Sequence, residues 1–391
     1  MKKILDTALK ILKWTGIVIG SLIVILLIVR FTGTAINRIT PDGGINEEVY
    51  IDVNGQKQWL GIYGEDKNNP VMLYLHGGPG NSTSYADWAI MRKLAKDYTV
   101  VSWDQRDCGK TWLKDPKGTP VTSELMRKDL KVVVDYLLEH LNKEKLTFLG
   151  MSWGTYYDCD FALAYPEKTE CIINLSQCVD EKVSALAVRE YYLEKTKNDP
   201  EYHALAEKYE PLIFDNMTDK QKQDFESWQN AAPEQRKKME ESNSELKSFL
   251  ERTKEQTLIV TRLSEKYMFP EEDVFAESDI NLAGAVFFNP YYSIGELIGI
   301  LNYDADKDFN MKQKNFFDEF SLKDKKTYSV PIYVMQGDKD DIGGVAEKYI
   351  GSITAPDKDF RYISGGHMST ILQSEKLSEF VHNISEKLKR L

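Results

Sequence analysis

Residues 146–154 read Leu-Thr-Phe-Leu-Gly-Met-Ser-Trp-Gly, and this stretch decides the fold of the chain. It begins as an apolar run typical of a buried strand, and residues 153–164 continue it with a helical pattern. Ser152 lies between the two, with Gly150 and Gly154 two residues away on either side. A strand that turns sharply into a helix strains the backbone of the middle residue, and glycines avoid collisions at the flanking positions. The stretch therefore predicts a nucleophile elbow with Ser152 at its tip.

A nucleophilic serine needs a base, and the chain has only five histidines. Behind an elbow of this kind the carboxylate and then the histidine follow the serine along the chain, which excludes His76 and His140. His203 lies in a charged helical segment, and His382 lies on the charged closing helix, where a solvated side chain is expected. His367 stands in a glycine-rich loop directly after the last strand-like run. We therefore predict that His367 is the base.

The carboxylate that orients the histidine is expected directly after the preceding strand. Residues 331–336 form that strand-like run, and Gly-Asp-Lys-Asp-Asp follows at 337–341. The spacing Gly-x-x-Asp favours Asp340, with Asp338 as the second candidate.

An oxyanion hole needs two backbone N–H groups. The first is expected from Trp153, the residue after the nucleophile, and the second from a loop after an early strand. Residues 76–80 read His-Gly-Gly-Pro-Gly and supply such a loop. We predict Gly78 at this position, with Gly77 as the alternative.

Strand-like and helical patterns alternate around the elbow. Two strand-like runs, 49–53 and 57–63, flank Asn54-Gly55, which predicts a β-hairpin. The alternation that follows predicts an α/β fold with a mostly parallel central sheet and helices on both faces.

The pattern changes between residues 181 and 326. Charged and aromatic residues are frequent there, and strand signals are few. A helical block inserted into an α/β sheet indicates a cap, so we predict a helical cap at 181–326 between two parts of one core, 48–180 and 327–391.

The N-terminus predicts a membrane helix. Lysines precede an uncharged apolar run at 14–29, and Arg30 closes it. This pattern predicts an anchor at 1–31 with its N-terminus in the cytoplasm, a linker at 32–47, and a catalytic part outside the cell. The alternative is a signal peptide cleaved near Gly33-Thr-Ala, which would release a secreted protein.

Composition excludes several classes of protein. A net charge of -11 argues against nucleic-acid binding, which needs a cationic surface. The four cysteines form no CxxC pair and the chain lacks HExxH, so no metal site is expected.

Three segments together resemble the signature segments of the prolyl iminopeptidase branch of α/β hydrolases. They are His-Gly-Gly-Pro-Gly at 76–80, Asp-Gln-Arg-Asp-Cys-Gly-Lys-Thr at 104–111 and Gly-Met-Ser-Trp-Gly at 150–154. The resemblance covers roughly residues 48–180 and 328–390. It implies an α/β-hydrolase fold with a helical cap, no cofactor, and attack on a small amide or peptide bond. It also implies site residues: a triad of Ser152, Asp340 and His367, and an oxyanion hole lined by Gly78 and Trp153.

Two departures from that family concern the substrate. Asp107 stands where the family usually has glycine, which adds a negative charge to a loop near the site. Such enzymes also hold the substrate amine with cap carboxylates, for which Glu190, Glu194 and Glu296 are the candidates. The leading hypothesis is a membrane-anchored serine hydrolase that releases N-terminal, proline-like residues from short peptides. The alternatives are an esterase or amidase for small acyl substrates on the same triad, and a non-catalytic binding protein that retains the fold.

Overall fold

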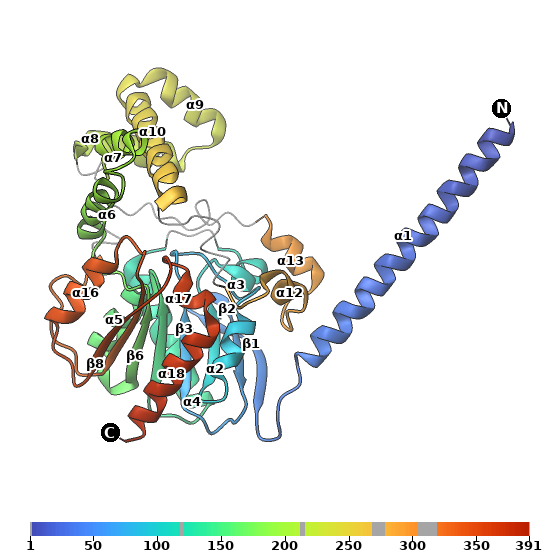
Figure 1. Cartoon of the computed structure of the whole chain (residues 1–391), viewed down its shortest axis with the longest axis horizontal. Coiled ribbons are helices and arrows are strands. Elements are labelled where there is room, and N and C mark those ends of the chain that lie inside the picture. Colours follow the sequence, from blue (N-terminus) through green and yellow to red (C-terminus); the bar gives the residue numbers. More distant parts are fainter. Residues whose placement is uncertain (1, 118–120, 212–215, 268–277, 303–318, 391) are drawn as a thin grey trace.

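An eight-stranded sheet organises the chain in the computed structural model, which describes residues 2–117, 121–211, 216–267, 278–302 and 319–390 (Figure 1). The spatial order of the strands is β1-β2-β4-β3-β5-β6-β7-β8. Strands β3 to β8 are parallel, and only β1 and β2 run against their neighbours, so the mostly parallel sheet is confirmed. The strands are β1 (Ile45–Val53), β2 (Gln56–Gly64), β3 (Val71–Leu75), β4 (Thr99–Asp104), β5 (Leu146–Met151), β6 (Thr169–Leu175), β7 (Ile332–Gly337) and β8 (Lys358–Ile363).

The first two strands form the predicted hairpin. Val53 pairs with Gln56, and the two residues between them, Asn54 and Gly55, have φ angles of 46° and 83°. Positive φ at both central positions is the geometry that asparagine followed by glycine adopts with little strain.

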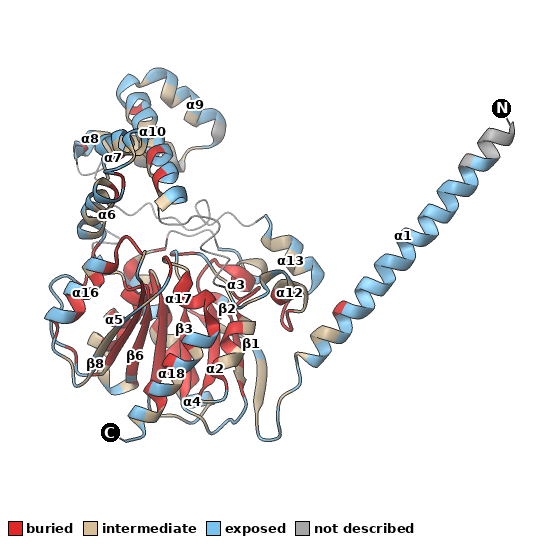
Figure 2. Ribbon diagram, in the orientation of Figure 1, coloured by how far each residue is buried: buried red, intermediate tan, exposed pale blue. Residues whose placement is uncertain are grey.

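Helices cover both faces of the sheet, so each face has its own hydrophobic core. Neighbouring strand residues such as Phe148 and Leu149 belong to opposite cores because strand side chains alternate between faces. One core packs against α4 (Ser123–His140), α5 (Gly154–Ala164) and α16 (Gly343–Ser352); the other packs against α2 (Trp88–Leu94) and α18 (Ser374–Leu388). Figure 2 shows the resulting buried layer through the strands.

Between β6 and β7, the described residues contain helices and no named strand. These helices are α6 (Glu181–Lys195), α7 (Pro200–Lys208), α8 (Asp219–Asn230), α9 (Pro233–Ser242), α10 (Ser244–Tyr267), α12 (Leu282–Phe287) and α13 (Ile294–Ile300). Helix α6 contacts the loop after β7, because the Tyr191 hydroxyl donates to the Lys339 carbonyl at 3.3 Å and the Tyr192 hydroxyl donates to Asp341 at 3.4 Å. The exact limits of the cap, 181–326, stay a prediction.

The N-terminal helix α1 (Lys2–Ile36) projects away from the sheet (Figure 1). Among the described residues it is the one helix long and apolar enough to cross a membrane, with a mean hydropathy of 2.4 over its most apolar part and none of that part buried. Figure 2 shows its surface exposed along nearly its whole length. The helix ends at Ile36, and the limits of the anchor, 1–31, and of the linker, 32–47, stay a prediction.

The strand order reverses direction at β3. From β3 the chain moves to β4 on one side and then to β5 on the other. In open parallel sheets, ligands bind beyond the carboxyl ends of the strands at such a reversal. The loops after β3 and β5, at residues 76–80 and at Ser152, lie at this point.

Candidate active site

Ser152 lies at the turn from β5 into α5 and has a φ of 53°, which is unusual for a residue with a side chain. The flanking glycines explain how the turn fits. A Cβ atom at Gly150 would lie 2.1 Å from the Asp158 carboxylate, and one at Gly154 would lie 2.1 Å from the Leu75 carbonyl. Only glycine fits at these two positions, so the sequence Gly-x-Ser-x-Gly forms the strained turn of a nucleophile elbow.

His367 lies in the loop after β8 and is bonded to Asp340 in the loop after β7. Its Nδ1 is 2.8 Å from Asp340 Oδ2, and the Asp340 side chain is fully buried. Asp340 also accepts hydrogen bonds from the Gln336 side chain at 2.7 Å and from the Ile342 amide at 3.3 Å. With a carboxylate acceptor at Nδ1, the ring proton is held on that atom and Nε2 is left with a lone pair.

The elbow and the histidine loop meet at the end of β6. The Ser152 amide donates to the Leu175 carbonyl at 2.9 Å, and the hydroxyl of the next residue, Ser176, donates to the His367 carbonyl at 2.6 Å. The structure therefore brings the loops that carry the three predicted triad residues to one strand end.

Two carboxylates set the charge around His367. Burial opposes the charged imidazolium, but the neighbouring Asp340, through its charge and hydrogen bond, and the charge of Asp341 together raise the pKa of His367 above its ordinary value of 6.5. Burial, followed by repulsion from Asp340, raises the pKa of Asp341 to about 7. The site thus favours the protonated imidazole, which is the state of a general base after it has accepted a proton.

The second aspartate candidate has a different contact. Asp338 accepts a hydrogen bond from the Gly365 amide at 2.9 Å. In turn, the Lys339 amide donates to the Gly365 carbonyl at 2.9 Å. Asp338 therefore holds the histidine loop against the loop after β7, while Asp340 contacts the imidazole itself.

The other four histidines bond elsewhere. The structure pairs His76 with the Gly77 carbonyl, His140 with Glu47, His203 with Thr196 and His382 with Asp97. His76 belongs to the loop that approaches the elbow, but burial lowers its pKa to about 4, so its imidazole is neutral.

The loop after β3 lies against the nucleophile. A Cβ atom at Gly77 would be 3.1 Å from Ser152 Cβ and 3.7 Å from its Oγ, so Gly77 approaches the serine closely. Gly78 follows with a φ of 118°, and a Cβ there would be 2.7 Å from the Asn81 amide. Trp153, the other predicted member of the oxyanion hole, is the N-cap residue of α5.

The loop after β4 supports the loop after β3. Asp104 is buried and accepts hydrogen bonds from Ser84 at 2.9 Å, from the Lys110 amide at 2.6 Å and from the Tyr292 hydroxyl at 3.3 Å. Burial raises the pKa of Asp104, although hydrogen bonds from Ser82, the Lys110 amide and Ser84 and the charge of Lys110 oppose this change. Through these hydrogen bonds, Asp104 links the segment after residues 76–80 to the segment between α12 and α13.

Asp107 has hydrogen-bond partners in two other segments. Its φ is 53°, and aspartate is among the residues that tolerate this conformation. Its carboxylate accepts from the Gln56 side chain at 2.6 Å and from the Lys117 amide at 2.9 Å. Gln56 is the first residue of β2, and an effect of the Asp107 charge on the substrate stays a prediction.

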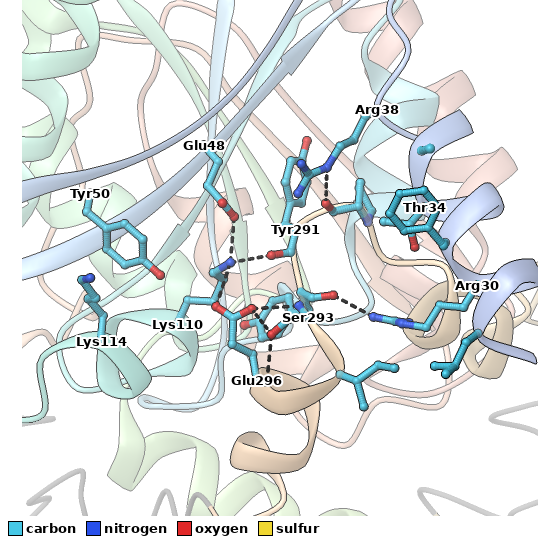
Figure 3. Close-up of a pocket in the computed structure, with 16 residues that line it drawn as sticks. Arg30, Thr34, Arg38, Glu48, Tyr50, Lys110, Lys114, Tyr291, Ser293 and Glu296 are labelled. Carbon is cyan, nitrogen blue, oxygen red and sulfur yellow. Dashed lines mark hydrogen bonds and ion pairs between the residues drawn. The ribbon is translucent and has the colours of Figure 1, made fainter. Parts of the chain in front are cut away.

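The three candidate glutamates lie on two different helices. Glu190 and Glu194 are exposed on α6, and Glu194 pairs with Lys197. Glu296 lies in the first turn of α13 and accepts from the Ser293 hydroxyl at 2.7 Å, and it pairs with Lys110 at 3.2 Å (Figure 3). No described contact joins any of the three to His367 or Asp340.

Cys178 is a neighbour of Ser152 that the sequence analysis did not identify. Burial, followed by the charges of Asp340 and Glu181, raises the pKa of its thiol, while hydrogen bonds with Ser152 and Thr155 oppose that change. The thiol is therefore neutral. Its position three residues beyond the end of β6 was the available signal, because β6 is the strand beside the elbow.

An apolar cavity of about 590 Å³ opens beside the loop after β3. Asn81, whose amide donates to the Gly77 carbonyl at 3.4 Å, connects this cavity to the glycine that touches Ser152. Its described lining comes from this loop, Gly109, Val286 and α13, and holds no carboxylate: Asn81, Ser82, Thr83, Tyr85, Gly109, Val286, Ile294, Leu297, Ile298, Ile300 and Leu301.

Comparisons with known proteins agree with this arrangement. A family model described as alpha/beta hydrolase fold matches residues 70–373, which is more than half of the chain. A probable aminopeptidase from Bacillus subtilis is 33% identical over 130 residues, covering 33% of this chain and 41% of the relative. A proline iminopeptidase from Lactobacillus helveticus is 34% identical over 125 residues, covering 30% of this chain and 40% of the relative. The match therefore spans about two fifths of the length of these curated relatives.

Solved structures show a similar fold. The proline iminopeptidase-related protein from Thermus thermophilus superposes with a TM-score of 0.55 at 19% identity, covering 88% of this chain and 98% of that chain. The proline iminopeptidase from Mycobacterium smegmatis gives a TM-score of 0.54 at 16% identity, with coverage of 88% and 98%. At these identities the similarity concerns the fold alone.

Proposed function

The chain belongs to the alpha/beta hydrolase fold family, and from this premise we propose that it is a membrane-anchored serine hydrolase with a triad of Ser152, His367 and Asp340. The observation that carries the proposal is the 2.8 Å hydrogen bond between His367 and the fully buried Asp340, beside the strained turn at Ser152. A histidine held by a buried carboxylate next to a serine at an elbow is the arrangement that general-base catalysis of acyl transfer requires.

In the proposed mechanism, Nε2 of His367 takes the proton from Ser152 Oγ as that oxygen attacks the substrate carbonyl. The Trp153 amide and an amide of Gly78, or of Gly77 as the alternative, stabilise the oxyanion. His367 then gives its proton to the leaving group, and water hydrolyses the acyl-enzyme by the same steps. Asp340 stays ionised and holds the imidazole in the required tautomer.

For the substrate, we propose the N-terminal residue of a short peptide, with preference for proline-like residues. Support comes from the similarity of about a third of the chain to a probable aminopeptidase and to proline iminopeptidases. Recognition of a free amine needs a carboxylate near the site, for which Glu190, Glu194 and Glu296 remain the candidates. Such a charge-assisted contact contributes roughly 1.5–3 kcal/mol.

One observation favours a second function, an esterase or amidase for small acyl substrates. The cavity beside the loop after β3 is apolar, and its described lining has no carboxylate that could meet an ammonium group. In addition, the charge of Glu296 is already offset by Lys110. An apolar acyl group suits such a cavity better than a charged amine does.

The test compares three substrates with the full-length protein in detergent: prolyl-naphthylamide, N-acetylprolyl-naphthylamide and p-nitrophenyl acetate. A peptidase should prefer the free amine by at least about tenfold in kcat/KM, the equivalent of ~1.4 kcal/mol. Equal rates for free and blocked amines, or activity on the ester alone, would replace the peptidase by the esterase. No turnover of any substrate above that of Ser152→Ala would contradict the hydrolase proposal.

The amine contact is tested by changing each candidate glutamate to glutamine. The variant that removes the contact should lose the preference for the free amine while it retains ester hydrolysis. Glu379→Gln, on the exposed surface of α18, is the matched control and should keep the preference. If all three variants behave like this control, none of the three glutamates binds the amine.

We also propose that α1 anchors the protein with its N-terminus in the cytoplasm and the sheet outside, with secretion after cleavage as the alternative. The lysines before residue 14 support this orientation. Protease added to intact, wall-stripped cells should remove the catalytic part. Protection of the full-length protein until lysis would contradict this orientation, and a soluble product that starts near Ile36 would establish cleavage.

A further inference from the structure

A second cavity, of about 770 Å³, lies where the end of α1 meets the body of the protein (Figure 3). One wall comes from α1 and contains both apolar and cationic side chains. The opposite wall comes from β1, α3 (Gly109–Lys114) and the segment before α13. The triad residues are not among the residues that line it, so it is separate from the candidate active site.

The junction is held by specific contacts. Arg30 donates to the Phe287 carbonyl and, at 2.7 Å, to the Tyr292 carbonyl, and Arg38 donates to the Pro290 carbonyl at 2.7 Å. A Cβ atom at Gly33 would be 2.3 Å from the ring of Phe288, so the helix packs closely against this segment. The cavity therefore lies at a fixed position relative to α1.

The position along α1 gives the depth of the cavity in a membrane. Arg30 closes the uncharged run of 14–29, and the cavity extends from Leu27 to Arg38 along this end of the helix. The end of an apolar span lies at the boundary between the hydrocarbon core and the headgroups, which is where lipid phosphates are found.

The cavity carries an excess of positive charge, although the whole chain is acidic. Lys110 is offset by Glu48 at 2.7 Å and by Glu296 at 3.2 Å. In contrast, Arg30 and Arg38 donate to neutral carbonyls, and within the part of the chain that the structure describes no carboxylate forms an ion pair with either of them. A guanidinium that donates to carbonyl oxygens keeps its full charge for a ligand.

Lys114 adds a further cation on the opposite wall. It is exposed, and its ammonium group lies 5.6 Å from the centre of the Tyr50 ring. Arg38 is also exposed, so both groups are accessible from the surface. Leu27 and Phe31, both exposed on α1, supply an apolar surface on the membrane side of these cations.

We propose that this cavity binds an anionic phospholipid, with the phosphate at Arg38 and an acyl chain along Leu27 and Phe31, while Lys114 adds positive charge from the opposite wall. Arg30 is buried beside the cavity, where it adds positive charge and holds α1 in position through its bonds to the Phe287 and Tyr292 carbonyls. Bound lipid fixes the orientation of the sheet relative to the bilayer. The inference rests on the proposed membrane helix and does not depend on hydrolase activity.

The test measures lipid binding to full-length protein in mild detergent by native mass spectrometry. The probes are dioctanoyl phosphatidylglycerol and dioctanoyl phosphatidylcholine, with glycerol phosphate as a competitor. Each cation beside an anionic headgroup contributes about fivefold to binding. Phosphatidylglycerol should therefore bind at least about fivefold more tightly than phosphatidylcholine, and Arg38→Gln/Lys114→Gln should abolish that preference.

Two further double variants test whether the lipid preference depends on positive charge at these two positions. Arg38→Lys/Lys114→Arg keeps both charges and should keep the preference, whereas Lys237→Gln/Lys254→Gln removes the same charge from exposed cap positions and should leave binding unchanged. Circular dichroism of each variant verifies that it is folded. Equal binding of the two lipids, a preference that survives Arg38→Gln/Lys114→Gln, or displacement by glycerol phosphate at equal concentration would each overturn the proposal. Ester hydrolysis by the wild type tests the proposed function separately.

Discussion

The substitution Asp340→Asn tests the proposed triad at the contact that the structure defines best. Asp340 Oδ2 receives both the His367 Nδ1–H at 2.8 Å and the Gln336 amide at 2.7 Å, and Oδ1 receives the Ile342 amide at 3.3 Å. Asparagine has one acceptor oxygen for these three donors. If its NH₂ group replaces Oδ2, His367 must accept at Nδ1 and carry its proton on Nε2, where it can no longer take the serine proton.

If the asparagine oxygen replaces Oδ2 instead, its NH₂ group meets the Ile342 N–H. This orientation leaves a buried donor without a partner, at a cost of about 1–3 kcal/mol. It also removes the charge that stabilises the imidazolium. In the first orientation the asparagine NH₂ group also meets the NH₂ group of Gln336, so each orientation leaves a buried donor without an acceptor. Because each orientation also impairs His367 as a base, kcat should fall by roughly 10⁴-fold with little change in substrate binding.

The assay is single-turnover acylation by p-nitrophenyl acetate, because it isolates the step in which His367 takes the proton. Asp338→Asn is the matched control: it loses the bond to the Gly365 amide but leaves the imidazole contact intact, so its effect should be at least about a hundredfold smaller. A larger loss in Asp338→Asn than in Asp340→Asn would refute the assignment and move the orienting role to Asp338.

Three further predictions concern pH and packing. The pKa that controls the acid limb of kcat/KM should lie above 6.5, because Asp340 and Asp341 outweigh burial and raise the pKa of His367. In Asp341→Asn this limb should move to lower pH, and an unshifted limb would contradict the coupling. The pKa of Asp341 is the ordinary 3.8 in the unfolded chain and about 7 in the folded protein. Because the folded state disfavours the charged carboxylate, Asp341 should lower the free energy of unfolding as the pH rises between these two values. Asp341→Asn should then be more stable than wild type at pH 8, by at most about 4 kcal/mol in urea unfolding, with little difference at pH 4. Gly154→Ala should lose about 1–3 kcal/mol because its Cβ meets a backbone carbonyl, whereas Gly351→Ala, with open space around it, should not; equal melting temperatures would contradict the packing at the elbow.

Much of the fold could be predicted from local patterns. The hairpin at Asn54-Gly55 and the elbow at Ser152 depend on backbone conformations that few residues adopt, so their sequences are diagnostic. The alternation of strands and helices then leaves few topologies. In contrast, the contacts of the segment after α1, such as the hydrogen bond of Asn37 with the Phe288 carbonyl, could not be predicted, because their partners lie far away in the sequence.

The site residues differ in the same way. His367 could be predicted by elimination among five histidines, and Asp340 was favoured over Asp338 by its spacing from a strand end. The side chains on cap helices could not be assigned, because a glutamate on a charged helix has no local signal for the direction in which it points. The partners of Asp107 could not be predicted either, because its carboxylate bonds to Gln56 on β2, a contact that only the tertiary structure reveals.

Labelling by a fluorophosphonate probe tests the central claim most directly, because the probe reacts with a serine only when an adjacent base activates it. Full-length protein in detergent is treated with the probe and analysed by peptide mass spectrometry, beside Ser152→Ala. The account predicts a single modified peptide that carries the probe on Ser152, no labelling of Ser152→Ala, and a fall in turnover of roughly 10⁴-fold or more in that variant. Equal labelling of wild type and Ser152→Ala, or modification at another serine, would contradict it.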